Sequence, residues 1–359
     1  MSGPETTQPP GYEDTQSNPT QPAIAAEDDA AFDDELDTGS LAGNSTASIT
    51  SSVLNYRMVA DIMRTEKANM LSYALHPWFW KRNLLTGGFL PKPNDEREQE
   101  RLDIHHHIFN LVLGGELYCA PISNGVSRIL DLGTGTGAWA IDMADKMPQA
   151  IVIGTDLSPI QPLWVPANCT FEIDDFELDW RYQYPFDFIH ARNIEGSVKD
   201  HKRLLQQALN NLTPGGWLEV ADATVGVFCD DETIDRAPNL LEWKDRLIEA
   251  SHKFGKPMGV AKHYKDWLTE AGFTHVQQEV YKVPFSRWAK DPKLKELGAY
   301  QQILMLEALD AYSFALFTRV LGWSAARIQL LLAGVRKELL DRKFHGYSKL
   351  YFVYGQKPS

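Results

Sequence analysis

From residue 127 onward, short apolar runs alternate with segments whose apolar residues recur at helical spacing. The strand-like runs are 127–132, 150–157, 169–175, 186–192 and 215–225, and the helical patterns include 137–147 and 200–212. Apolar runs of about five residues separated by helix-length segments are typical of a buried, mostly parallel sheet with helices on both faces. The pattern therefore predicts an α/β fold with a doubly wound, Rossmann-like sheet.

Two further strands are predicted near the C-terminus, at 273–284 and 349–356. The first alternates apolar and polar residues, which suits an edge of the sheet. Between them, residues 292–343 show two helical patterns. We expect this C-terminal helical insertion to lie over the carboxyl edge of the sheet, within a domain that spans 121–359.

An N-terminal helical arm is expected over 47–120. Its last helix is predicted within 93–115, with Asn94 as a candidate N-cap and Gly114 and Gly115 at its end. An aromatic and proline-rich connection precedes this helix. The arm therefore leads directly into the first strand of the sheet.

Charge separates the first 46 residues from the rest of the chain. The net charge is −13, and residues 1–50 hold ten acidic residues and no Lys or Arg, which leaves about −3 for the remainder (−13 minus −10). We expect 1–46 to be a disordered acidic tail, because it lacks the apolar residues that offset chain entropy. No direct nucleic-acid binding is expected, because clustered Lys and Arg are absent.

The three cysteines are widely spaced and form no CxxC pair, so neither a disulfide framework nor a metal site is predicted. The first ten residues lack a basic region and an apolar region, and the apolar stretch 311–323 is interrupted by Arg319. We expect a cytoplasmic protein without membrane contact, and a nuclear location if its role is regulatory.

A glycine-rich turn follows the first predicted strand of the sheet. Gly133, Gly135 and Gly137, followed by Ala138, satisfy the pattern G-x-G-x-x-A, and Asp156 lies roughly 20 residues on. Such a turn admits either a dinucleotide or S-adenosylmethionine (SAM). The glycines alone do not separate these two ligands.

Three acidic positions in order favour SAM. Asp131 precedes the turn, where its charge suits an ammonium and a sulfonium and would repel a pyrophosphate. Asp156 ends the next strand and can accept from both ribose hydroxyls. Asp175 follows the third strand and can accept from an adenine amine, while Phe176 packs on the ring.

These motifs make the chain similar to the class I SAM-dependent methyltransferases, and more narrowly to the fungal secondary-metabolism group that includes the LaeA-type regulators. The similarity covers about residues 55–357. It implies SAM as the cofactor. Position by position, it places the cofactor loop on Asp131, Gly133, Thr134, Gly135 and Gly137, the ribose acid on Asp156, and the adenine contact on Asp175 and Phe176.

The resemblance implies a methyltransferase that acts on a small-molecule acceptor in fungal secondary metabolism. The alternative is a LaeA-like regulator that binds SAM and acts through protein partners. A dehydrogenase is a distant third interpretation.

The acceptor should bind where the fourth and fifth strands end, at the switch point of the sheet. His190 is the candidate general base, and its other interpretation is a histidine packed beneath the cofactor. Arg192 and Asn193 are candidate substrate contacts from the same segment, and Trp78 and Tyr300 are candidates from the arm and the insertion. Arg192 could instead pair with an acid such as Glu195.

Consecutive histidines at 105–107 do not predict a metal site, because neighbouring residues on a helix diverge by about 100°. We expect one of them to face the pocket and the other two to lie on the surface. The arm and the insertion together predict an apolar acceptor pocket, with a homodimer interface as the alternative.

Overall fold

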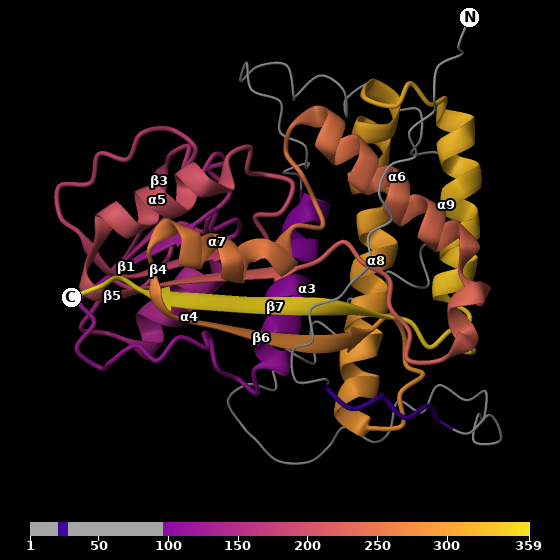
Figure 1. The fold of residues 1–359 in the computed structure, drawn as a ribbon, viewed down its shortest axis with the longest axis horizontal. Helices are drawn as coiled ribbons and strands as arrows, with labels where there is room; N and C mark the ends of the chain where they lie inside the picture. The colour runs from indigo at the N-terminus through magenta and orange to yellow at the C-terminus, as the bar shows by residue number, and fades with distance from the viewer. Residues whose placement is uncertain (1–20, 28–95) are drawn as a thin grey trace, which may run out of the picture.

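A computed structural model describes residues 21–27 and 96–359 of the chain. Trp78, Asn94 and most of the predicted arm lie outside the described residues. Within them, one large twisted sheet and a separate group of long helices stand side by side (Figure 1).

The sheet has seven strands in the order β3-β2-β1-β4-β5-β7-β6, and β7 runs antiparallel to both of its neighbours. The strands are β1 (Arg128–Leu132), β2 (Ile151–Asp156), β3 (Cys169–Ile173), β4 (Phe186–Arg192), β5 (Leu212–Ala223), β6 (Thr274–Pro284) and β7 (Tyr347–Gln356). The order reverses between β1 and β4, which is the switch point expected of a doubly wound sheet. The predicted fold class is confirmed, including the edge position of β6.

The described helices are α3 (Glu96–Val112), α4 (Ala138–Lys146), α5 (His201–Asn211), α6 (Pro238–Phe254), α7 (Tyr264–Ala271), α8 (Pro292–Arg319) and α9 (Ala325–Leu339), with short 3-10 helices at Glu232–Arg236 and Ala261–His263. Side-chain caps define several of their starts. Asp291 accepts from two backbone N–H groups of α8, and Ser324 accepts from one N–H of α9. Gly114 and Gly115 follow α3 with positive φ, as predicted.

Alternate residues of the strands enter cores on opposite faces of the sheet. Leu130 and Ile189 pack with α5 and α7 on one face, whereas Ile129 and Phe188 pack with α4 on the other. Helix α3 joins the α4 side, where Phe109 packs on β7. The sheet is therefore covered on both faces, and its carboxyl edge stays available for a site.

The insertion forms a second core together with a helix that the sequence analysis did not predict. Side chains of α8 and α9 pack on Leu240, Trp243 and Leu247 of α6. The two helices predicted within 292–343 are present as α8 and α9. The helical body nevertheless begins with α6, so it is larger than expected.

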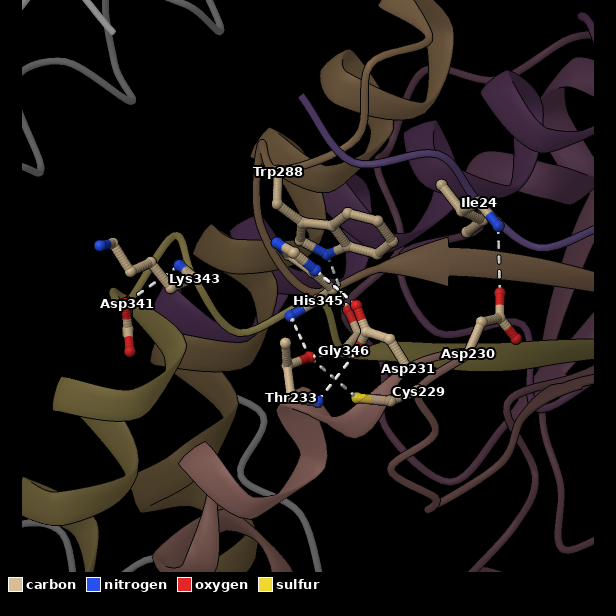
Figure 2. Close-up of polar contacts among 10 residues, drawn as sticks. All are labelled: Ile24, Cys229, Asp230, Asp231, Thr233, Trp288, Asp341, Lys343, His345 and Gly346. Carbon is tan, nitrogen blue, oxygen red and sulfur yellow. Dashed lines mark hydrogen bonds and ion pairs between the residues drawn. The ribbon is translucent and has the colours of Figure 1, made fainter. Parts of the chain in front are cut away.

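Part of the predicted disordered tail packs on the domain, contrary to expectation. The segment Gln21–Glu27, here called the strap, forms an antiparallel bridge between Ala26 and Ala289. The Ile24 N–H donates to Asp230 Oδ2 at 3.1 Å (Figure 2). This short stretch is mostly apolar, and averaging the composition over 46 residues concealed it.

Asp230 is the polar anchor of the strap. Besides Ile24, it accepts from Lys282 Nζ at 2.7 Å and from the Tyr347 hydroxyl at 2.8 Å. Burial alone would raise the pKa of Asp230, but these hydrogen bonds outweigh it and hold the pKa below the usual range. The Lys282 ammonium also donates to the Pro22 carbonyl. The strap therefore joins β6 to the segment that follows β5.

Among the helices of the described residues, none has the length and apolar character needed to cross a membrane.

Candidate cofactor and acceptor sites

The glycine turn after β1 adopts a backbone that side chains rarely tolerate. Gly135 and Gly137 have φ of +59° and +82°. A Cβ on Gly137 would lie 2.4 Å from the Phe171 ring, so this position has no room for a side chain. Thr134 fixes the turn to the strand, because its hydroxyl donates to Asp131 Oδ2 at 2.6 Å.

Asp156, at the end of β2, holds the turn from the other side. Its Oδ2 accepts from the Gly135 N–H and its Oδ1 from the Ser158 N–H, both at 2.9 Å. Burial raises the pKa of Asp156, and those two N–H groups lower it in part. A carboxylate offers about four lone-pair sites. Asp156 can therefore also accept from a diol bound in the cavity beside it.

Asp175 and Phe176 follow β3 and line the same cavity. Asp175 Oδ1 accepts from the Glu177 N–H at 2.9 Å, which fixes the bend that carries Phe176. The Phe176 ring lies against Gly133, where a Cβ would approach its edge to 3.4 Å. The ring is therefore placed to pack on a flat group above the glycine turn.

Helix α3 closes this cavity, which we call the cofactor cavity. Glu98, Leu102 and His106 line it at i, i+4 spacing, as one stripe of the helix. A Cβ on Gly135 would lie 3.3 Å from Leu102 Cδ1. No cofactor contact was predicted on α3, although the i, i+4 spacing of these three residues is visible in the sequence.

Arg192 lines the cofactor cavity rather than the acceptor side. Its Nη2 donates to His106 Nδ1 at 2.9 Å, and its guanidinium lies over the Phe109 ring. Burial lowers the pKa of Arg192 to about 10, so it remains charged at neutral pH. The predicted alternative, pairing with Glu195, is not formed, because Glu195 faces two backbone N–H groups instead.

A second cavity lies between the carboxyl edge of the sheet and the helical body, and we call it the acceptor cavity. It encloses about 790 Å³, part of it open to solvent. Most of its wall is apolar: Val225, Val227, Trp243, Leu247, Met258, Phe285, Leu304, Met305 and Ala308. A cavity of this size and lining suits a small organic molecule.

Asn193 lines both cavities. It follows β4 with φ of +56°, a conformation that Asn tolerates better than most residues, and its N–H donates to the Ala221 carbonyl. Its Nδ2 lies 3.1 Å from Nδ1 of His105, which lines the acceptor cavity. The two cavities therefore meet at Asn193, as its predicted substrate role requires.

Two carboxylates line the acceptor cavity, and protein donors hold both. Glu195 accepts from the N–H groups of Gly259 and Ala261. Asp222 Oδ2 accepts from the Tyr264 hydroxyl at 2.7 Å. Burial raises the pKa of Glu195, although the backbone donors lower it in part. These contacts give both carboxylates a role in positioning the segments around the cavity.

His190 lies beneath the cofactor cavity. It is 1% exposed, its Nδ1 lies 2.8 Å from Asp131 Oδ1, and its ring stacks on Trp139 with centroids 3.7 Å apart. Burial lowers the pKa of His190, and Asp131 opposes this only in part. This geometry matches the second interpretation, a histidine packed under the cofactor. The catalytic role stays a prediction, without a contact to the acceptor cavity to support it.

The three consecutive histidines diverge, as the helical geometry requires. His105 faces the acceptor cavity and His106 the cofactor cavity, while His107 meets the Tyr300 ring at 4.5 Å. Two of the three therefore line cavities, one more than expected. Tyr300 packs on α3 and does not line the acceptor cavity; Leu304, one turn later on α8, does.

The residues around the cofactor cavity fit SAM. The bare glycine backbone leaves space beside β1, Asp156 retains lone pairs for a ribose, and Phe176 offers an aromatic face. Asp131 is 2% exposed, and its oxygens are engaged by His190 and Thr134, so its charge stays fixed at the floor of the cavity. This arrangement suits a cationic ligand better than a pyrophosphate.

Comparison with known proteins agrees with this geometry. Residues 104–278 match a family described as a methyltransferase domain. Methyltransferase pytC of Aspergillus terreus is 41% identical over 272 residues, which cover 76% of this chain and 84% of that protein.

Two other relatives differ in the role that their names state. Probable methyltransferase tdiE of Emericella nidulans is 34% identical over 295 residues, covering 81% of this chain and 93% of that protein. Secondary metabolism regulator LAE1 of Cochliobolus heterostrophus is 36% identical over 278 residues, covering 76% and 91%. The relatives thus include both methyltransferases and a regulator.

Proposed function

We propose that this chain, which belongs to the LaeA-like fungal family of class I SAM-dependent methyltransferases, transfers the methyl group of SAM to a small-molecule acceptor in secondary metabolism. The single observation that carries the proposal is the pair of cavities that meet at Asn193. One cavity has the residues that fit SAM, and the other is mostly apolar and partly open to solvent. An acceptor in the second cavity lies beside the first.

In this proposal the site residues hold the cofactor and orient the acceptor. When bound, SAM supplies an electrophilic methyl group on a sulfonium. Asp156, Phe176 and the glycine turn would hold the cofactor, and Arg192 would hold its carboxylate. The wall formed by α6 and α8 would align the acceptor, and alignment can supply much of the acceleration of such a displacement.

We assign no dedicated base for proton removal from the acceptor among the described residues around the cavity. Glu195 and Asp222 already accept from protein donors, and His190 is buried under the cofactor cavity. His105 is the imidazole that lines the acceptor cavity, and Asn193 fixes its ring. We assign His105 and Asn193 to orienting the acceptor atom.

The proposal is tested by incubating the protein with methyl-labelled SAM and a metabolite extract of the producing organism. We expect label in an extractable small molecule. Leu304→Trp should fill the acceptor cavity and abolish transfer while SAM affinity and mass in solution stay unchanged. Leu330→Trp, at a position that is 77% exposed on α9, is the matched control and should transfer normally.

The second candidate function is SAM-dependent regulation through protein partners, which the similarity to LAE1 favours. In that case the same assay gives robust SAM binding with no labelled metabolite. A shift from dimer to monomer in Leu304→Trp would instead identify the apolar surface of α8 as a homodimer interface.

A further inference from the structure

Two buried polar side chains, Ser348 and Gln301, line the acceptor cavity. Ser348 is 4% exposed, and its Oγ has no hydrogen-bond partner within residues 21–27 and 96–359. Gln301 is 5% exposed, and its amide offers two donors and an acceptor. A buried polar group left unpaired is costly, so the Ser348 hydroxyl is suited to a ligand that supplies the missing partner.

The two side chains face the same space. Ser348, Leu350 and Phe352 are alternate residues of β7, so their side chains lie on the same face of the sheet. Leu350 and Phe352 pack on the face that α8 covers. Gln301 comes one helical turn after Gly298, where a Cβ would lie 2.1 Å from the Ser286 carbonyl. Helix α8 therefore runs close to the end of β6, and Val283 of β6 pairs with Ser348.

This polar pair lies at a distance from the point where the two cavities meet. Asn193 follows Arg192, and Arg192 pairs with Ala221 of β5. Asp222, which follows Ala221 on β5, pairs with Tyr351 of β7. Ser348 precedes Tyr351 by three residues, which is roughly 10 Å along β7, and β7 lies two strand spacings, roughly another 10 Å, across the sheet from β4. The wall of the cavity as a whole is mostly apolar.

We propose that Ser348 and Gln301 bind a neutral hydrogen-bonding group of the acceptor, such as a hydroxyl or carbonyl, at the far end of an apolar body from the methylated atom. Both side chains are uncharged, and the two cations that line the cavity already pair with carboxylates, Arg101 with Glu98 and Lys244 with Asp245. The acceptor is thus an elongated molecule that is polar at both ends.

The inference rests on the proposed function only in naming the ligand a methyl acceptor, and its test needs no methyl transfer. The probes are para,para-biphenol and para-phenylphenol, which differ by one terminal hydroxyl. Their affinities are measured by calorimetry in the presence of S-adenosylhomocysteine. We expect wild type to bind the biphenol about tenfold more tightly.

Two variants test whether Ser348 and Gln301 cause the tighter binding of the biphenol. Ser348→Ala and Gln301→Met should each lower the affinity ratio to within about threefold of unity, with S-adenosylhomocysteine affinity unchanged. Ser286→Ala, a buried serine that does not line the cavity, is the control and should keep the wild-type ratio.

The proposal is overturned if wild type does not distinguish the probes, including by binding neither, or if both variants retain the preference. Either result, with S-adenosylhomocysteine still bound, would contradict the proposed binding role of Ser348 and Gln301 and leave the methyltransferase proposal intact. Loss of S-adenosylhomocysteine binding in wild type would instead contradict the cofactor site.

Discussion

Gly135 lies between two contacts that leave little space for a side chain. It has φ of +59°, its N–H donates to Asp156, and a Cβ would lie 3.3 Å from Leu102 Cδ1. We expect Gly135→Val to weaken SAM binding at least roughly tenfold, because the side chain would enter the cofactor cavity. Calorimetric titration measures the loss.

A control separates backbone strain from obstruction of the cavity. Gly255→Val introduces a side chain at φ of +87°, where a Cβ would meet nothing within 4 Å. This variant should bind SAM normally even if it is less stable. Equal loss of affinity in both variants would show that strain, rather than the cavity, governs binding.

Glu219 predicts a pH dependence of stability. It is fully buried in β5, its Oε2 accepts from the N–H groups of Cys119 and Ala120, and its Oε1 has no partner among the described residues. Burial raises the pKa of Glu219 to about 7 from 4.5, although the two N–H groups lower it in part. The protonated carboxyl therefore contributes stability that is present below pH 4.5 and is lost as the pH rises through 7.

Glu219→Gln keeps the shape and removes the titration. Between about pH 5 and about pH 8, the free energy of unfolding of wild type should fall by roughly 2–3 kcal/mol relative to the variant. Denaturant titrations at the two pH values measure this difference. A constant difference across that range would contradict a raised pKa.

At the scale of elements, the strap is the clearest departure from the sequence-based expectation. Deletion of residues 1–27 should lower the free energy of unfolding by about 1–2 kcal/mol relative to deletion of residues 1–20, because the hydrogen bonds to Asp230 and Lys282 are lost. SAM affinity should be equal in both proteins, since no strap residue lines the cofactor cavity. Equal thermal stability of the two truncations would show that the strap contributes nothing.

The sheet and its glycine turn were predictable because local pattern determines them. Five parallel strands, the position of Gly135 and the acid at Asp156 all follow from runs of eleven residues or fewer. Helix α6 was also within reach, since Leu240, Trp243 and Leu247 recur at helical spacing before Gly255. The strap was not, because seven residues give no period to detect.

The acceptor cavity could not be located from sequence. Its walls come from α3, the end of β4, α6, α8 and β7, which are up to 247 positions apart, from Arg101 to Ser348. Two sets of α3 residues at i, i+4 spacing line the two cavities: Arg101 and His105 the acceptor cavity, and Glu98, Leu102 and His106 the cofactor cavity. The spacing is visible in the sequence, but nothing local indicates which cavity each set faces. Tyr300 illustrates the difficulty: it lies one turn before Leu304, yet it packs on His107.

At the scale of the whole molecule, the protein combines two bodies. The sheet carries the cofactor cavity at its carboxyl edge, and the helical body of α6, α8 and α9 has a core of its own and forms part of the wall of the acceptor cavity. Because that core is separate from those of the sheet, we expect substitutions in the lining of the helical body to leave the cofactor cavity unchanged. This division suits a family whose relatives are named both as methyltransferases and as a regulator.

The central claim is that the cofactor and acceptor cavities meet at Asn193, and a crystal structure with S-adenosylhomocysteine tests it most directly. The account predicts the adenine beside Phe176, the ribose hydroxyls at Asp156 and the sulfur directed toward Asn193. A ligand bound in the acceptor cavity, or bound in the cofactor cavity with its sulfur directed away from Asn193, would contradict it.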